Sequence, residues 1–343
     1  MPPLPAMGTG TVTSDGVRPP TPQQRATAPH TSIDARLPQS QGLRSAAGSD
    51  ASGVVRNAMT VDVEDYYQVQ AFAGCVSRHD WNNLPSRVER NTDHLLAMFD
   101  RAGVSATFFV LGCVAERHPE MLRRIVAGGH EIASHGWEHI LVHNQTPEAF
   151  AADVRQTKAL LEDLAGVEVT GYRAATFSIG KRTPWAFEVL AAEGYRYSSS
   201  IYPVHHDLYG MPDAPRTPFR PDGGTLWEIP MTTLRLMDRN LPCSGGGYFR
   251  LVPYWLFRQA LARVNKTERL RGIFYLHPWE IDPAQPRIHA AGRLSKFRHY
   301  VNLEKTEARL SRLLQDFVWD RMDRVYADVL ATPDAGSAPH AAA

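Results

Sequence analysis

Apolar runs of strand length alternate with amphipathic stretches of helix length through most of this chain. In chain order, the clearest strand and helix segments are AMTVDV (58–63), SRVERNTDHLLAMFDRAG (86–103), ATFFVL (106–111), PEMLRRIVAGG (119–129), EIAS (131–134), TPEAFAADVRQTKALLEDLAG (146–166), TLWEIPMTTLRL (225–236) and GIFYLH (272–277). Repeated units of this length predict an α/β fold with a mainly parallel sheet, open or closed into a barrel. Functional residues are then expected at the carboxyl ends of the strands.

The composition along the chain divides it into four segments. Residues 1–56 are rich in Pro, Ser, Thr, Ala and Gly without apolar periodicity, so we expect them to be disordered. The alternating pattern occupies residues 57–285 and defines the main folded domain. Residues 286–331 carry a basic stretch with a helical apolar stripe, which predicts an extension packed on that domain. The low-complexity tail, residues 332–343, is expected to fray.

The overall charge excludes some classes of partner. Lys and Arg number 37 against 36 Asp and Glu, a formal net charge of +1, so nothing global favours nucleic acid or a membrane surface. The three cysteines form no CxxC pair, which argues against a zinc ribbon or a disulfide framework. The N-terminus lacks the basic and apolar regions of a signal peptide, and no run approaches the roughly eighteen apolar residues of a membrane span. A cytoplasmic protein without a transmembrane segment is therefore expected.

Two clusters of potential metal ligands follow strands. His135 and His139 lie four residues apart directly after one apolar strand, and Asp62, Glu64 and Asp65 crowd the end of another. The carboxylates repel one another unless a cation or a basic residue neutralises them. Two imidazoles can face one cation if their segment turns helically, and a carboxylate would complete a three-ligand shell with room for water. Surface histidines and a solvated strand end are the alternative, but the two clusters together favour a metal site.

Further polar residues mark other strand ends. His277 ends the last strongly apolar strand, and Pro278 cannot continue a ladder, so the imidazole belongs at the rim of the sheet as a functional or a capping group. Arg173 also ends a strand and can either form a structural ion pair or orient a catalytic carboxylate. His130 precedes the strand of the histidine pair, so it belongs at the opposite end and is structural.

Other segments say less about chemistry. The run SGGGYFR (244–250) lacks the features of a phosphate loop and indicates a tight backbone passage. No serine occupies a GxSxG elbow, so a serine hydrolase finds no support. Several aromatic residues lie near strand ends and can either stack on sugar rings or belong to the core: Tyr66, Tyr67, Trp137, Phe177, Tyr202 and Trp279.

Four ordered motifs resemble those of the polysaccharide deacetylase family with the NodB homology domain, carbohydrate esterase family 4. They are TVDVED (60–65), ASHGWEH (133–139), YRAATFS (172–178) and YLH (275–277), and the resemblance covers roughly residues 57–285. Within that family, TVDVEDYYQV, GGGYFRLVPY, YLHPWEIDP and RHYVNL resemble the branch associated with exosortase (XrtA) loci, which has a C-terminal extension.

The resemblance implies a fold and an activity. The fold would be an irregular (β/α)7-type barrel with a C-terminal helical extension. The activity would be metal-dependent hydrolysis that removes N-acetyl groups from amino sugars of a bacterial polysaccharide in exopolysaccharide biosynthesis. The cofactor would be a divalent metal ion, with zinc (Zn2+) expected, and the partner an N-acetylated polysaccharide or oligosaccharide.

The resemblance also implies residue roles. Asp62 would be the general base, steadied by Arg173, and His277 the general acid. His135 and His139 would be metal ligands, Leu276 would line the acetyl pocket, and Phe177 and Trp279 are expected to contact the sugar.

The chain departs from the family pattern at three places. The usual adjacent aspartates are separated by Val63 and Glu64, so strand alternation favours Glu64 as the third ligand whereas residue identity favours Asp65. The proline expected after Arg173 is replaced by Ala175. The fourth-motif aspartate, which would tune His277, has no counterpart near YRYSSSIYP.

Two other functions remain as alternatives. An allantoinase-like enzyme would hydrolyse a cyclic amide on the same fold, but the complete set of carboxylates and histidines argues against it. A catalytically silent carbohydrate-binding protein would use the aromatic rim as its surface. Metal content and acetate release separate the three functions.

Overall fold

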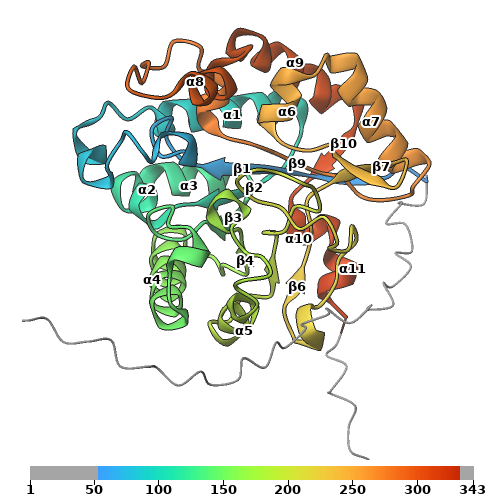
Figure 1. Cartoon of the computed structure of the whole chain (residues 1–343), viewed down its shortest axis with the longest axis horizontal. Coiled ribbons are helices and arrows are strands. Elements are labelled where there is room, and N and C mark those ends of the chain that lie inside the picture. Colours follow the sequence, from blue (N-terminus) through green and yellow to red (C-terminus); the bar gives the residue numbers. More distant parts are fainter. Residues whose placement is uncertain (1–52, 333–343) are drawn as a thin grey trace, which may run out of the picture. The chain divides into compact units, whose positions relative to one another are not determined.

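One curled sheet of eight strands forms the centre of the computed structural model, which describes residues 53–332 (Figure 1). Its order is β10-β1-β2-β3-β4-β5-β6, with β9 also paired to β1, and each of these ladders is parallel. The strands are β1 (Arg56–Val63), β2 (Thr107–Val110), β3 (Glu131–Ser134), β4 (Gly171–Tyr172), β5 (Tyr197–Ser198), β6 (Trp227–Glu228), β9 (Ile273–Leu276) and β10 (Val318–Asp320). The α/β fold with a parallel, barrel-like sheet is thereby confirmed.

The sheet curls without closing. In the part of the chain that the structure describes, β6 and β9 share no ladder, and β7 (Thr233–Leu236) with β8 (Arg239–Pro242) forms a separate antiparallel hairpin. Side chains beside this hairpin partly replace the missing ladder. Ile273 donates its N–H to Oγ1 of Thr232 at 2.5 Å, and its carbonyl accepts a hydrogen bond from Ser244 Oγ at 2.6 Å. Polar side chains therefore form the hydrogen bonds of backbone groups on the free edge of β9, which has no neighbouring strand there in the open barrel.

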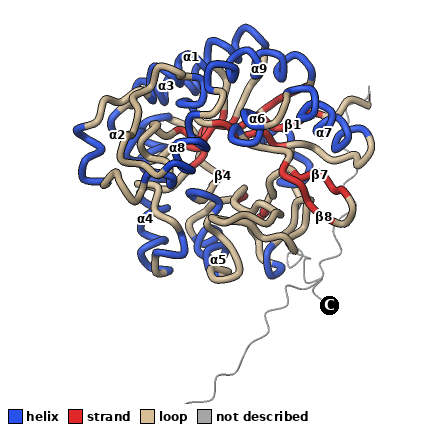
Figure 2. The backbone as a smooth tube through the Cα atoms, turned by 45° about the horizontal axis from the view of Figure 1, so that its top comes forward, coloured by secondary structure: helices blue, strands red, loops and turns tan. Residues whose placement is uncertain are grey.

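Helices lie around the outside of the sheet (Figure 2). They are α1 (Val88–Ala102), α2 (Gly112–Arg117), α3 (Pro119–Ala127), α4 (Pro147–Ala165), α5 (Trp185–Ala192), α6 (Gly246–Leu251), α7 (Tyr254–Lys266), α8 (Arg293–Tyr300), α9 (Leu303–Asp316), α10 (Met322–Val325) and α11 (Ala327–Leu330). The helix expected over 146–166 forms as α4, where Thr146 Oγ1 accepts the N–H of Ala149 and Gly166 ends the helix at φ 66°.

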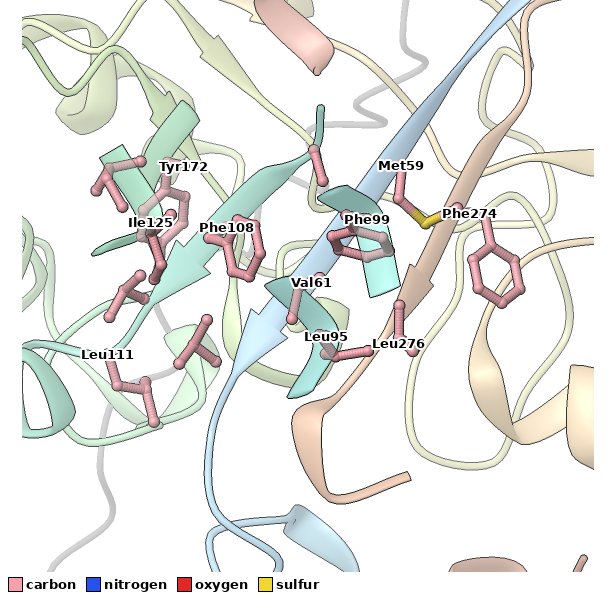
Figure 3. Packing of buried hydrophobic residues seen from close by; sticks show 14 of the residues in the cluster. Met59, Val61, Leu95, Phe99, Phe108, Leu111, Ile125, Tyr172, Phe274 and Leu276 are labelled. Atoms are coloured by element: carbon pink, nitrogen blue, oxygen red, sulfur yellow. The ribbon is translucent and has the colours of Figure 1, made fainter. Parts of the chain in front are cut away.

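Strand alternation sorts the side chains of the sheet into two cores. On β1, Met59, Val61 and Val63 point outward into the core under the helices, where Leu95 of α1 packs beside them (Figure 3). The intervening residues of β1, which include Asp62, point to the inside of the curl. Side chains alternate in the same way on the neighbouring strands. Every second residue of a strand therefore packs in the core under the helices, and the residues between them point to the inner face.

We expect Leu95→Ala to lower the free energy of unfolding by roughly 2–5 kcal/mol, because Leu95 is fully buried and its loss leaves a cavity under the sheet. Chemical denaturation measures this change. Leu294→Ala is the matched control, since its side chain is 60% exposed and its truncation should change stability by less than about 0.5 kcal/mol. Equal effects of the two substitutions would contradict this packing.

The C-terminal extension does more than pack on the barrel. β10, which belongs to it, pairs with residues 56–58 of β1, and Arg56 forms an ion pair with Asp320 at 2.9 Å. The expected disorder and the expected absence of a signal peptide concern mainly residues 1–52 and 333–343, which lie outside the described part. Arg56, the last residue of the segment expected to be disordered, is the first residue of β1. Among residues 53–332, every helix is too short or too polar to span a bilayer.

Candidate metal centre

The inner-face residues at the ends of three neighbouring strands of the sheet, β9, β1 and β3 with β2 between the last two, meet at one edge. Asp62 lies near the end of β1, His135 follows β3 and His277 follows β9. β1 pairs with β9 on one side and with β2 on the other, and β2 pairs with β3, so these carboxyl ends are close together. Glu64 comes two residues after Asp62 and faces the same side. The sheet topology thus collects the polar residues that the sequence placed at separate strand ends.

Glu64, His135 and His139 form a buried group of potential metal ligands. One ligand atom from each lies within 4.8 Å of the others, and Oε2 of Glu64 is 3.2 Å from Nε2 of His139. Nδ1 of His135 lies 2.8 Å from the carbonyl oxygen of Arg173. A carbonyl can only accept, so Nδ1 carries the hydrogen and Nε2 keeps the lone pair that a metal ion needs.

The electrostatics of this group fit a divalent cation. Burial lowers the pKa of His135 and places that of His139 well below its usual value, so both imidazoles are neutral. Burial raises the pKa of Glu64 to about 7, against the opposing effect of His277. Within the described part of the chain, Oε2 of Glu64 is buried without a hydrogen-bond partner. A buried carboxylate oxygen between neutral imidazoles is a donor set that a divalent ion would satisfy.

The segment that brings the imidazoles of His135 and His139 together is a loop and not a helix. No helix covers residues 135–141, Gly136 has φ 77° and His139 has φ 53°, so the two imidazoles approach each other without the helical turn that was the condition considered from the sequence. Arg78 holds this loop by donating to the carbonyls of Glu138 at 2.9 Å and His139 at 3.0 Å. A non-glycine residue with positive φ is uncommon, and here it turns the second imidazole back toward the first.

Asp65 is not part of the metal group. Its Oδ2 accepts hydrogen bonds from the N–H groups of Arg87 at 2.7 Å and Val88 at 3.2 Å and from Ser86 Oγ at 2.8 Å. These donors are at the start of α1, so the carboxylate caps that helix. The assignment of Asp65 as a ligand is therefore corrected: one residue further along the chain than Glu64, its side chain points to the opposite face.

We expect Glu64→Ala to lower the metal content of the purified protein, whereas Asp65→Ala keeps the metal and lowers stability by about 1 kcal/mol, the usual cost of a lost helix cap. Metal analysis after gel filtration, together with thermal unfolding, measures both effects. Loss of metal from the Asp65 variant alone would contradict the geometry.

Arg173 forms a hydrogen-bonded ion pair with Asp62. Its fully buried guanidinium donates to Oδ1 of Asp62 at 2.6 Å and to Thr60 Oγ1 at 2.9 Å, and lies 4.0 Å from the ring centre of Phe109. Nε donates to the carbonyl of Ser199 at 3.1 Å. Of the two roles left open by the sequence, the arginine forms a buried ion pair, and that pair also fixes the orientation of the carboxylate.

His277 stands between two carboxylates. Its Nε2 is 3.1 Å from Oε1 of Glu64, and its Nδ1 is 2.8 Å from Oε1 of Glu280. Burial lowers the pKa of His277, but Glu64 and Glu280 outweigh it and raise the pKa to about 9. Glu280 is not among the residues predicted from the sequence. The available signal was its position three residues after His277, the spacing of a capping box at the short helix that follows.

A cavity of about 170 Å³ opens over these residues, and aromatic side chains line it. Phe177 and Trp279, for which a contact with the sugar is predicted, are among them, together with Tyr209 and Tyr275. Leu276 is not: it is buried in the outer core, because it points to the opposite side of β9 from Tyr275. The expectation that Leu276 lines the pocket is therefore wrong, and Tyr275 occupies that place.

The remaining residues of interest lie outside the cavity. Tyr66 and Tyr67 are buried in a separate apolar cluster, and Tyr202 lies in the inner core. Trp137 is half-buried and lies against Gly112. His130 accepts the N–H of Ala106 through Nδ1 at 3.0 Å near the other end of β3, which is the structural role expected for it.

Two consecutive segments of the chain match different families. Residues 81–198 match the family Polysaccharide deacetylase, and residues 199–327 match a family described as Domain of unknown function (DUF3473). The chain thus contains a polysaccharide deacetylase domain over residues 81–198. His135, His139 and Arg173 lie in the first match, His277 and Glu280 lie in the second, and Asp62 precedes both.

Curated relatives are similar to this chain over part of its length, and a solved structure shares its fold. The chain is 26% identical to the peptidoglycan deacetylase of Helicobacter pylori over 185 residues, which are 52% of this chain and 59% of that protein. It is 27% identical to the chitooligosaccharide deacetylase of Rhizobium leguminosarum bv. trifolii over 117 residues, 34% of this chain and 50% of the relative. The matches thus span little more than half of these relatives. The crystal structure of a candidate polysaccharide deacetylase from Mycobacterium smegmatis shares the fold, with a TM-score of 0.54 at 20% identity over 83% of this chain and 94% of that one.

Proposed function

We propose that this protein hydrolyses the N-acetyl groups of amino sugars in a bacterial polysaccharide, with a divalent metal ion held by Glu64, His135 and His139. The observation that carries the proposal is the buried three-ligand group, which has Asp62 and His277 beside it. Two neutral imidazoles and one carboxylate suit zinc and leave a coordination position for water or substrate.

The residues around the group can perform amide hydrolysis. When bound, a divalent ion lowers the pKa of water and polarises a carbonyl oxygen. Asp62, fixed by Arg173, is placed to accept a proton from the attacking water. His277, with a pKa of about 9, carries a proton at neutral pH and can give it to the nitrogen that leaves. Acetate and a free amino sugar are the products.

The surroundings of the site favour a chain of sugars over a single sugar. A second hollow, of about 870 Å³ and largely polar, runs along residues 67–82 and reaches His139. It shares Val69, Gln70 and His139 with the cavity over the metal group. An open polar groove that continues from an aromatic pocket suits a polysaccharide. We place the polymer among exopolysaccharides because of the motifs that resemble the exosortase-associated branch.

The alternatives fit the site less well. An allantoinase-like cyclic amide hydrolase needs neither the aromatic pocket nor the long groove. A silent carbohydrate-binding protein would have no use for a buried carboxylate and two imidazoles arranged for a cation, since burying such groups costs stability.

Purified protein, stripped with a chelator and reloaded with zinc, tests the proposal. We expect about one zinc ion per chain and release of acetate from N-acetylglucosamine oligomers only in the loaded form. Zinc binding without acetate release, but with hydrolysis of allantoin, would favour the cyclic amide hydrolase. Oligosaccharide binding without turnover of any amide would favour the binding protein.

A further inference from the structure

The glycine-rich segment SGGGYFR, residues 244–250, has no part in the chemistry described so far, yet it lies against the His277 side of the site. Gly246 begins α6, and a methyl group added there would overlap both carboxylate oxygens of Glu280. At the preceding Gly245, whose φ is 89°, an added methyl group would overlap the ring of Tyr275. The tight backbone passage that the sequence indicated is therefore a close approach of α6 to the residues that flank His277.

The same helix supplies the partner of Glu280. Arg250 lies four residues after Gly246 and is 2% exposed, and its Nε donates to Oε2 of Glu280 at 2.7 Å. Its terminal nitrogens donate to backbone carbonyls, including that of His299 at 2.8 Å and that of Val301 at 3.0 Å. These bonds fix the planar guanidinium, which therefore holds Oε2 of Glu280. Gly246, which has no side chain, leaves the space that the carboxylate occupies.

The other carboxylate oxygen of Glu280, Oε1, forms hydrogen bonds with His277. Oε1 accepts the backbone N–H of His277 at 3.0 Å and lies 2.8 Å from Nδ1 of its ring. Burial would raise the pKa of Glu280, but Arg250 and His277 lower it to about 2, so the carboxylate is ionised and can only accept. Nδ1 therefore keeps a hydrogen whether or not the ring is charged, and Nε2, which carries the second hydrogen of the charged ring, is directed toward the metal group, 3.1 Å from Glu64.

We infer that Gly246 and Arg250 of α6, acting through Glu280, keep a hydrogen on Nδ1 of His277 and fix the direction of its ring, so that Nε2 carries the transferable proton toward the scissile amide. Of these four residues only His277 lines the cavity, so Glu280, Arg250 and Gly246 are positioning residues. This inference rests on the proposed deacetylase function. It also gives the region 199–327 a role: that region holds the proton-donating half of the site.

Two neighbouring glycines provide the test. Gly246→Ala should push the Glu280 carboxylate away without removing it, and we expect turnover of an N-acetylglucosamine oligomer to fall about 10- to 100-fold. Hydrolysis of an activated acetate ester should change little, because a phenolate leaves without a proton. Gly247→Ala is the control, since an added methyl group there meets nothing within 4 Å and its φ is not positive, and both activities should stay at the wild-type level.

Glu280→Gln gives a second route in case Gly246→Ala does not fold. A glutamine cannot accept from both His277 and Arg250 with its single carbonyl oxygen, so the same selective loss of amide turnover is expected. Metal content should remain at the wild-type value in both variants. A wild-type amide-to-ester ratio in a folded variant, or an equal loss of both activities, would overturn the inference.

Nitrogen-15 NMR of the histidine rings separates this inference from the proposed function. The wild-type protein should show a hydrogen-bonded proton on Nδ1 of His277, and Gly246→Ala should lose that signal. If the wild type releases no acetate but the signal behaves as expected, the deacetylase proposal fails and the positioning role stands. If acetate is released and the signal does not depend on Gly246, the positioning role fails alone.

Discussion

His139→Ala should retain almost no zinc and should release no measurable acetate from N-acetylglucosamine oligomers. The substitution removes one of three ligands from a buried site, and a site with two remaining ligands holds zinc poorly. The fold should persist, because His139 lies in a loop and its backbone carbonyl, which accepts from Arg78, is kept. Zinc per chain after gel filtration, circular dichroism and the acetate assay measure the three expectations.

His130→Ala is the control for this prediction. It removes another histidine of the same segment, but one whose imidazole accepts a backbone N–H near the other end of β3. We expect it to lower the thermal midpoint while zinc content remains at the wild-type level. If His139→Ala kept its full zinc and its full rate, the ion would have to bind elsewhere in the chain.

Strand periodicity predicted those parts of the site that follow directly from a strand. The alternation along β1 places Asp62 and Glu64 on the inner face and Asp65 on the outer face, and the structure shows Asp65 on the helix side. The same rule, applied to β9, would have placed Tyr275 inside and Leu276 outside. The resemblance of the YLH motif points instead to Leu276, which the structure places in the outer core.

Features of the fold and of the site that depend on tertiary contacts could not be predicted from the sequence. The run 225–236 looks like one strand, but β6 and β7 belong to different sheets, with Pro230 between them. β10 is too short to be distinguished by composition, and it forms because β1 offers it a free edge. The contact of Glu280 with Arg250 joins residues thirty positions apart, and no local pattern encodes their meeting.

Asp62→Asn should keep its zinc and lose turnover by about 10²–10⁴-fold, because it removes a proton acceptor and not a ligand. The metal group consists of Glu64, His135 and His139, and Asp62 lies outside it. Asparagine has nearly the same shape and can still accept a hydrogen bond from Arg173, so the orientation of the side chain should survive. The loss should therefore appear in kcat much more than in KM.

The stability of this variant also has to be measured, because Asp62 is the charged partner of a fully buried arginine. Breaking such a pair costs roughly 3–5 kcal/mol, so the assay belongs well below the thermal midpoint of the variant. Arg173→Lys supplies a comparison: it keeps the charge but not the planar fork, and should slow turnover less than Asp62→Asn does. Asp62→Asn with a full zinc content and a rate near that of the wild type would show that another group takes the proton from water, and Asp62 would then serve only to neutralise Arg173.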